Sequence, residues 1–171
     1  TIGECTPRKN FHTLVDMLNE LPDYDLIISG KQNTDYAREK LAKQIKKHKL
    51  EKRVILTGKI NDTEKHYYLK NCAAFVFPSL REGFGIPPIE AMRFGKPLFL
   101  SNTTSLPEIG GKYAFYWDHY EPKYMASRFR KGMETYLAKK EWFSEQYMKH
   151  AQSFDWNKAA EKYIEVYRLL L

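Results

Sequence analysis

The sequence predicts an α/β domain in which a doubly wound parallel sheet carries helices on both faces and a helical C-terminal tail follows. Short apolar runs alternate along the chain with segments whose apolar residues recur at helical spacing. Two of these runs, residues 73–77 and 98–100, are apolar throughout, as strands covered on both faces require. From about Tyr120 the strand signals stop, and helical, aromatic-rich segments continue to the end.

The first third of the chain predicts two units of a strand followed by a helix. Residues 1–4 have the pattern of the end of a strand, and residues 26–29 that of a buried strand. Thr6-Pro7 is expected to open the first helix, because proline suits a first helical turn. Asn33 or Thr34 is expected to cap the second. The apolar residues at helical spacing are Phe11, Leu14, Val15, Leu18 and Leu21 in the first helix, and Ala37, Leu41 and Ile45 in the second.

The next elements lead into the most informative segment of the chain. Residues 54–57 are expected to form the third strand, and Asn61-Asp62-Thr63-Glu64 has the pattern of a capping box for a helix through Leu69. Residues 73–77 and 98–100 are the next two predicted strands. A helix beginning near Pro87-Pro88 joins them. This order predicts loops that meet at the carboxyl edge of one sheet, where such folds bind ligands.

The run from Glu82 to Glu90 has the composition of an anion site between two carboxylates. Two glycines let main-chain N–H groups approach a ligand, and paired prolines suit a helix start. Unpaired N–H groups and the helix dipole attract phosphate there. The two glutamates are therefore expected to bind neutral hydroxyls on either side of the anion. A sugar, a diphosphate and a ribose present that order of groups.

Each of these residues also has a structural interpretation. Glu90 can simply complement the dipole in the first helical turn, and Glu82 can be a solvated loop acid. Gly83 and Gly85 can make only a tight turn, since Gly-x-Gly alone is a weak signal. Arg8-Lys9 can be a solvated helix start. The conjunction of these residues at one spacing favours the ligand site.

The motif resembles that of the retaining nucleotide-sugar glycosyltransferases of family four, whose hallmark is two glutamates separated by seven residues in a Glu-Gly-Phe-Gly-Ile/Leu-Pro context. The similarity spans essentially the whole chain and weakens after about Tyr113. The other matching segments are Gly3, Arg8-Lys9-Asn10, residues 27–30, residues 54–58, Gly95-Lys96-Pro97 and residues 105–109.

The resemblance implies one half of a GT-B enzyme, which has two Rossmann-like domains with the active site between them. Residues 1–171 would be the single nucleotide-sugar-binding domain, with a core over 1–119 and a helical segment over 120–171. The N-terminal acceptor domain would be absent, and the start at Thr1 in the tail of a strand indicates a fragment. We therefore expect donor binding with little or no transfer by this chain alone. The terminal helix would pack toward the partner domain and expose apolar surface here.

The resemblance also implies roles for individual residues. The catalytic group would be Glu82, which orients the donor sugar, with Lys9 and Arg8 at the diphosphate. Lys9 matches the family's lysine, whereas Glu4 stands where the family often has arginine, so Arg8 is expected to substitute for it. Among the donor-binding residues, Lys59 and Ile60 would lie beside the nucleobase and Glu90 at the ribose. The others would be Gly30, Ser79 and the main chain of Gly83, Phe84, Gly85 and Ile86. Transfer would proceed with retention, without a cofactor and without an obligatory metal.

Composition favours one ordinary globular domain and gives no sign of a membrane span, a secretory signal or a zinc site. The chain has 171 residues, 43% of them hydrophobic, which suits one ordinary core. It contains no apolar stretch of the roughly 20 residues that a membrane span needs, and no secretory signal. Cys5 and Cys72 lack metal-like spacing, so they are expected to be reduced packing residues in a cytoplasmic protein. No zinc site is expected.

The net charge of +7 raises the question of an anionic partner. Much of this charge lies in a basic cluster on the second predicted helix and the turn after it. The cluster lacks a nucleic-acid motif or interleaved aromatic residues, so no nucleic-acid partner is expected. A solvated face is the simplest interpretation. Peripheral contact with anionic lipid on the inner face of the cell membrane is a secondary hypothesis that suits a lipid-linked acceptor. The cluster comprises Lys40, Lys43, Lys46, Lys47, Lys49, Lys52 and Arg53.

The function predicted from the sequence is hexosyl transfer from a GDP- or UDP-hexose to a glycan or lipid-linked acceptor, which the missing N-terminal domain would bind. Mannosyl transfer in cell-envelope polysaccharide assembly is the most specific form of this prediction. One alternative is a nucleotide-sugar epimerase or phosphorylase of the same architecture, which the spacing of the glutamates disfavours. The other is a non-catalytic, basic binding module.

Overall fold

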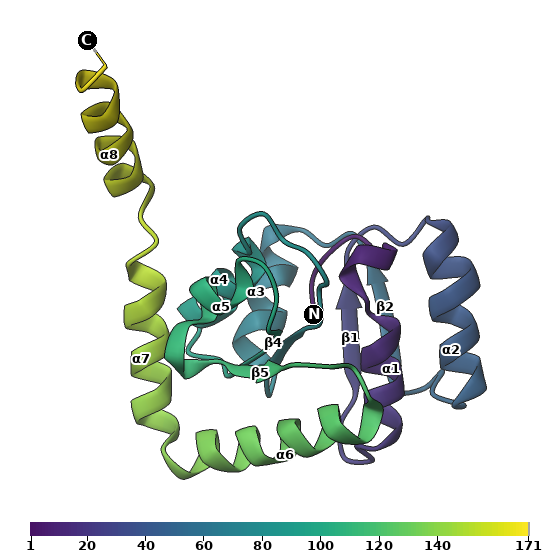
Figure 1. The fold of residues 1–171 in the computed structure, drawn as a ribbon. Helices are drawn as coiled ribbons and strands as arrows, with labels where there is room; N and C mark the ends of the chain where they lie inside the picture. Colours follow the sequence, from purple (N-terminus) through teal and green to yellow (C-terminus); the bar gives the residue numbers. More distant parts are fainter. Residues whose placement is uncertain (171) are drawn as a thin grey trace.

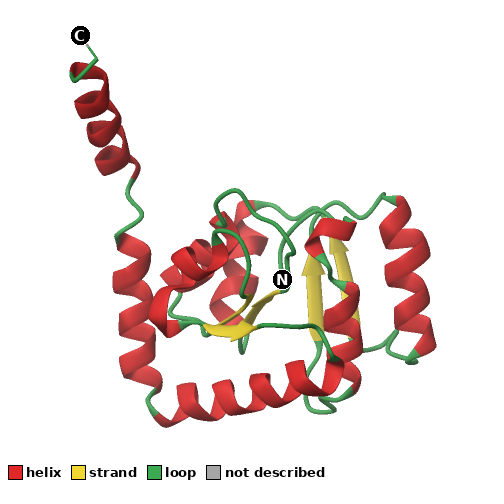
Figure 2. Cartoon of the chain, in the orientation of Figure 1, coloured by secondary structure: helices red, strands yellow, loops and turns green. Residues whose placement is uncertain are grey.

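The computed structural model, which describes residues 1–170, confirms the predicted α/β class (Figures 1 and 2). Its strands pair in parallel within two sheets. The first contains β1 (Leu26–Ser29) and β2 (Val54–Gly58), and the second has the order β3 (Phe75–Phe77), β4 (Leu98–Ser101) and β5 (Phe115–Trp117). Every residue of β3 and β4 is buried, as predicted for strands covered on both faces.

The segment before the first loop adds a single bridge to β1. Ile2 pairs in parallel with Ser29, and the Thr1 ammonium donates to the Ile27 carbonyl at 2.9 Å. Ile2 also packs against the apolar cluster around β3 and β4. The predicted strand end over residues 1–4 is therefore reduced to one bridge beside β1.

The first predicted helix is interrupted, which matters for the site. A short 3-10 helix, η1 (Pro7–Lys9), precedes α1 (His12–Asn19), and Asn10 separates them with φ +57°. The prediction of a continuous helix from Thr6-Pro7 is thus wrong, because asparagine readily adopts this left-handed conformation. The break leaves Lys9 buried in a tight turn, rather than on a solvated helix face.

The next two helices begin as their caps predict. The second consists of a π-helical segment, η2 (Tyr36–Leu41), followed by α2 (Ala42–Lys47). The Thr34 hydroxyl accepts a hydrogen bond from the Ala37 N–H at 3.1 Å, which identifies Thr34 as the capping side chain. The capping box at Asn61 is confirmed, and its helix α3 (Asp62–Asn71) ends two residues beyond the predicted Leu69.

The remaining helices surround the second sheet and extend from it (Figure 1). They are α4 (Ile86–Arg93), α5 (Leu106–Gly110), the short η3 (Gly111–Tyr113), α6 (Pro122–Ala138), α7 (Lys140–Gln152) and α8 (Trp156–Arg168). Helix α7 packs on α4, and α6 packs on α1 and β5. Helix α8 projects away from the rest of the chain, and none of its residues is buried, so the expected exposed apolar surface is present.

Two clusters of apolar side chains form the core. The first consists mainly of side chains from α1, β1, η2 and α6, and the second mainly of side chains from β3, β4, α4, α5 and α7. The aromatic tail is divided: Tyr147 is fully buried and Tyr136 nearly so, whereas Trp142, Trp156, Tyr163 and Tyr167 are exposed. Within residues 1–170, no helix combines the length and apolar character needed to cross a bilayer.

Candidate functional site

The motif loop follows β3 and is hydrogen-bonded to the turn that contains Lys9. The Leu80 N–H donates to the Arg8 carbonyl at 2.9 Å, and the Ser79 hydroxyl lies 3.2 Å from the same oxygen. Ser79 is fully buried, so it anchors the loop on the sheet edge. Two segments more than 70 residues apart in the chain are thereby brought to one place.

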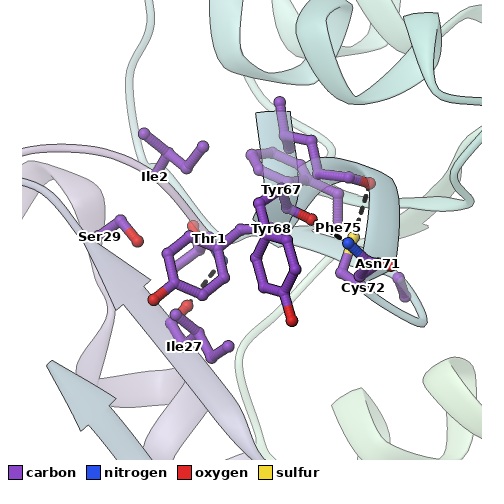
Figure 3. A pocket seen from close by; sticks show the side chains of 11 residues that line it. Thr1, Ile2, Ile27, Ser29, Tyr67, Tyr68, Asn71, Cys72 and Phe75 are labelled. Atoms are coloured by element: carbon purple, nitrogen blue, oxygen red, sulfur yellow. Dashed lines mark hydrogen bonds between the residues drawn. The ribbon is translucent and has the colours of Figure 1, made fainter. Parts of the chain in front are cut away.

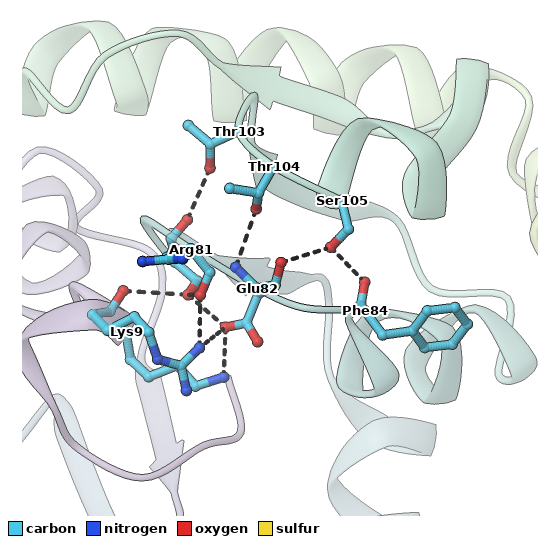
Figure 4. Close-up of polar contacts among 9 residues, drawn as sticks. Lys9, Arg81, Glu82, Phe84, Thr103, Thr104 and Ser105 are labelled. Atoms are coloured by element: carbon cyan, nitrogen blue, oxygen red, sulfur yellow. Dashed lines mark hydrogen bonds and ion pairs between the residues drawn. The ribbon is translucent and has the colours of Figure 1, made fainter.

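Glu82 is the centre of a compact ionic cluster (Figure 4). Its Oε1 atom accepts hydrogen bonds from Lys9 Nζ at 2.7 Å and from the Ser79 hydroxyl at 2.5 Å, and Arg8 Nη1 lies 3.0 Å away. The side chain is only 10% exposed. The interpretation of Glu82 as a solvated loop acid is therefore wrong.

The cluster keeps the Glu82 carboxylate ionised. Burial opposes ionisation, but the hydrogen bonds from Lys9 and Ser79 and the charges of Lys9 and Arg8 outweigh it. Together they hold the pKa of Glu82 below its ordinary value. A fixed negative charge is thus present at neutral pH.

The two cations differ in their surroundings. Lys9 is 7% exposed, and its Nζ atom lies 4.6 Å from the centroid of the Phe77 ring, a cation–π contact. Arg8 is exposed and also donates to the Arg81 carbonyl at 2.6 Å. The acid that replaces the family's arginine, Glu4, instead pairs with Lys31 at 3.1 Å. Arg8 and Lys9 thus both contact the Glu82 carboxylate, and the substitution of Arg8 for the expected arginine stays a prediction.

A run of three hydroxyl side chains after β4 holds the motif loop in shape (Figure 4). Thr104 Oγ1 accepts from the Glu82 N–H at 3.1 Å, and the Ser105 hydroxyl lies 2.7 Å from the Phe84 carbonyl and donates to it. Thr103 donates to the Ser79 carbonyl at 3.2 Å. Thr103 and Thr104 were not predicted to have a role. The available signal was a run of consecutive hydroxyl residues one position after a buried strand.

The glycine segment that leads into α4 carries main-chain donors without a protein partner among residues 1–170. Gly85 has φ +115° and is the N-cap of α4, a conformation that residues with a Cβ rarely adopt. Pro87 and Pro88 lie in the first turn, as predicted. Within residues 1–170, the N–H groups of Gly83, Phe84, Gly85 and Ile86 donate no hydrogen bond to the protein. They are available to an anion at the helix start.

Glu90 occupies the fifth position of α4, so it lies outside the first helical turn. The interpretation of Glu90 as a partner of the helix dipole is therefore wrong. Its Oε1 atom accepts from Lys65 Nζ of α3 at 2.8 Å. Lys65 also lies 3.1 Å from Asp62 Oδ1. Lys65 was not among the predicted residues, and its spacing of three residues from Asp62 was the only local signal.

The remaining predicted residues lie on neighbouring loops. Gly30 has φ +137°, and a Cβ there would lie 2.1 Å from the Gly3 carbonyl oxygen, so Gly30 lets the loop after β1 pack on the first loop. Its N–H donates to the Gly58 carbonyl at 2.8 Å. Lys59 is exposed and Ile60 is half-buried, directly before the cap of α3. Their location at this edge fits the prediction, and their contact with a nucleobase remains a prediction.

A cavity of about 340 Å³ lies away from the motif, between β1, α3 and β3 (Figure 3). Its lining is mainly apolar and includes Ile27, Tyr68, Cys72 and Phe75. None of the predicted site residues lines it. The candidate site is therefore the set of loops at the carboxyl edge of the strands, distinct from this cavity.

Metal-ligand chemistry is sparse in the part of the chain that the structure describes. No group of three histidine, cysteine, aspartate or glutamate side chains there is arranged to bind a metal ion. Cys5 and Cys72 are free, and Cys5 is fully buried. The groups that gather at the motif are instead carboxylates, cations, hydroxyls and main-chain N–H groups, which suit a phosphorylated and hydroxylated ligand.

Comparisons with known proteins agree with this chemistry. A family model described as "Glycosyl transferases group 1" matches residues 1–150. The serotype-specific mannosyltransferase WbdA of Escherichia coli is 32% identical over 181 residues, which cover 100% of this chain and 22% of that protein. The O-antigen chain mannosyltransferase B of Escherichia coli is 29% identical over 174 residues, 99% of this chain and 45% of that protein. The chain thus spans less than half the length of these relatives.

The fold also matches solved structures. The structure of HepE from Anabaena in complex with UDP superposes with a TM-score of 0.85 over 98% of this chain and 47% of that chain, at 24% sequence identity. HepE has also been solved in complex with UDP-glucose. At this identity the match establishes the shared fold.

Proposed function

Because the chain belongs to the group 1 glycosyl transferases, as the resemblance predicted, we propose that it binds the nucleotide-sugar donor of a retaining hexosyltransferase. The sugar transferred is a hexose, and we select mannose because the relatives WbdA and mannosyltransferase B are mannosyltransferases. The acceptor is a glycan or a lipid-linked sugar. We assign acceptor contacts to the part of these longer relatives that this chain does not match.

One observation carries the proposal: an ionised, largely buried glutamate lies beside two cations and directly before a run of N–H groups that, within residues 1–170, donate no hydrogen bond to the protein. A diphosphate has the charge and shape to bind Gly83 to Ile86 and the cations Arg8 and Lys9 together. Lys9 is able to serve both partners, because an ammonium has three N–H donors and Glu82 accepts one of them at 2.7 Å. A lysine about 4 Å from a phosphate gains roughly 4 kcal/mol at an effective dielectric constant near 20.

The proposed chemistry follows from where charge develops. Cleavage of the bond between the sugar and the diphosphate leaves negative charge on the phosphate and positive charge on the sugar. The N–H groups at the helix start and the Lys9 ammonium stabilise the negative charge on the phosphate. The fixed carboxylate of Glu82 stabilises the positive charge on the sugar. These charges are provided by protein groups, and we propose that no metal is required. Glu90 binds ribose hydroxyls, and Lys59 and Ile60 lie beside the base.

The nucleotide sugar is supported by HepE, which was crystallised with UDP and with UDP-glucose. We propose guanine or uracil as the base of the donor. Calorimetric titration of the 171-residue chain with GDP, UDP and ADP tests the site, with saturable binding of GDP or UDP expected. Salt-sensitive RNA binding without nucleotide binding would instead favour the basic binding module.

The role of Glu82 is tested by Glu82→Gln in the full-length enzyme. Loss of the fixed charge should lower kcat on the order of 10²- to 10³-fold, by analogy with removal of one electrostatic stabiliser. The Kd for the nucleoside diphosphate should change far less, since Glu82 is assigned to the sugar. Glu134→Gln, at an exposed position on α6, is the matched control. Equal losses in transfer and nucleotide binding would contradict this role.

A further inference from the structure

Lys65 lies between two carboxylates at the ribose side of the proposed site. Its Nζ atom is 2.8 Å from Glu90 Oε1 and 3.1 Å from Asp62 Oδ1. The side chains of Lys65 and Glu90 are 24% and 27% exposed, whereas that of Asp62 is 87% exposed. The contact with Glu90 is thus the shielded one, and it links helices α3 and α4.

The backbone of Lys65 is fixed by the start of α3. The Asn61 side chain accepts from the Glu64 N–H at 2.9 Å, and the Glu64 carboxylate accepts from the Asn61 N–H at 2.8 Å. The Lys65 N–H in turn donates to the Asn61 carbonyl at 2.9 Å. Lys65 therefore extends from a capped helical turn that directly follows Lys59 and Ile60.

Lys65 carries a positive charge at this position. Its hydrogen bond to Glu90 is the main cause, and its hydrogen bond to Asp62 the next, of a pKa raised above the ordinary value for lysine, so the ammonium stays charged throughout the neutral range. An ammonium that holds one oxygen of a carboxylate fixes the plane of that carboxylate. The second oxygen is then oriented before a ligand arrives, which lowers the entropy lost on binding.

We propose that Lys65 is a positioning residue that holds Glu90 through Oε1 and leaves Oε2 oriented toward the ribose hydroxyls. It also couples Glu90 to the loop assigned to the base, because both are anchored on the first turn of α3. This inference rests on the proposed donor site. By orienting Glu90, Lys65 would help the site distinguish a ribonucleotide from a nucleotide that lacks these hydroxyls.

An ordinary surface ion pair within one helix provides the contrast. Lys149 and Glu145 pair at 2.6 Å on α7, with side chains 64% and 55% exposed. Such exposed pairs contribute little. Lys149→Met is therefore a matched control that removes one paired lysine without touching the candidate site.

The experiment measures hydroxyl-dependent affinity by calorimetry on the 171-residue chain. Wild type, Lys65→Met, Lys65→Arg and Lys149→Met are titrated with UDP and GDP and with their 2′,3′-dideoxy counterparts. For whichever base the wild type binds, Lys65→Met should weaken the ribonucleotide on the order of tenfold, within the usual range of coupling between contacting residues. The Kd of the dideoxy compound should stay unchanged. Lys65→Arg should restore most of the affinity, and Lys149→Met should match wild type.

Two results would overturn the inference, and two others would reject the proposed site on which it rests. Equal weakening of both compounds by Lys65→Met would show a general structural or electrostatic effect, and no weakening of either would show that Lys65 does not position Glu90. If the wild type binds none of these nucleotides, the proposed donor site is wrong. If it binds the ribonucleotide and the dideoxynucleotide equally, the assignment of Glu90 to the ribose is wrong. Circular dichroism of each variant establishes that the fold is retained.

Discussion

Replacing Lys9 with methionine should destabilise the domain by about 2 kcal/mol, the scale of one charged hydrogen bond. Methionine keeps an unbranched stem against Phe77 but removes the ammonium that donates to Glu82. The perturbation thus isolates the charge at a position that is 7% exposed.

The magnitude depends on what remains around Glu82. An ion pair that is buried and loses one member typically costs about 3–5 kcal/mol, because the other charge is left unpaired. Here Arg8 Nη1 at 3.0 Å and the Ser79 hydroxyl at 2.5 Å still face Oε1. Only one charged hydrogen bond is lost, so the cost should be about 1.5–3 kcal/mol. At about 2–4 °C per kcal/mol for a domain of this size, that corresponds to a fall in Tm of roughly 3–12 °C.

Urea unfolding monitored by tryptophan fluorescence measures this difference at neutral pH. Lys31→Met is the matched control, because Lys31 pairs with Glu4 at 3.1 Å but both side chains are about half exposed. Its effect should stay below about 1 kcal/mol, as for other exposed pairs. If Lys9→Met proves no more destabilising than Lys31→Met, the electrostatic account of the Glu82 cluster is incorrect.

The pH dependence supplies an independent check of the same cluster. The folded-state pKa of Glu82 lies below its unfolded value, so Glu82 contributes stability above pH 4.5 that is lost as pH falls through the lower folded pKa. The advantage of wild type over Lys9→Met should therefore shrink on acidification below pH 4.5. A difference that stays constant down to the acid transition would show that it arises from packing rather than from ionisation.

Two further predictions concern the frame of the site and the terminal helix. Gly30→Ala should destabilise by about 3 kcal/mol or more, because its Cβ would meet the Gly3 carbonyl oxygen at 2.1 Å, whereas Gly58→Ala, with φ +75° and open space, should cost only about 1–2 kcal/mol. Similar urea midpoints for these two variants would contradict the packing role of Gly30. Deletion of residues 156–171 should leave the free energy of unfolding within about 0.5 kcal/mol of wild type, because no residue of α8 is buried. A lower midpoint on urea unfolding would show that α8 packs on the domain in solution.

The elements predicted correctly from sequence carry strong local signals. Strand β1 is found over the predicted residues 26–29, and the capping box at Asn61 is present. The glycine and proline signals before α4 also predicted its start, because they act within one turn of the chain. Strand β5 was missed, since Phe115-Tyr116-Trp117 is only three residues long and lies in an aromatic-rich region where helix and strand patterns are hard to distinguish.

The contacts that define the site depend on distance in space, which sequence spacing does not reveal. Lys9 and Glu82 are 73 residues apart and Lys65 and Glu90 are 25 apart. The resemblance to a known family brought Lys9 and Glu82 into one prediction, but it offered nothing for Lys65. The hydroxyls of Thr103 and Thr104 were missed for the same reason, because their partners lie on the loop after another strand.

The two acids of the motif share an arrangement that constrains how a donor enters. In each, Oε1 is paired with a lysine from another element, Lys9 for Glu82 and Lys65 for Glu90. Charge at the site is thus balanced before any ligand binds, and a nucleotide does not have to neutralise a buried, unpaired ion. In the proposed complex, the diphosphate would bind cations that already have a carboxylate partner, and the ribose and sugar hydroxyls would bind carboxylates that already have a cation. Nucleotide affinity should therefore depend on the orientation of these groups more than on the net charge of the domain. Loss of Lys65 or Lys9 should then weaken nucleotide binding more than loss of any lysine on the exposed basic helix α2.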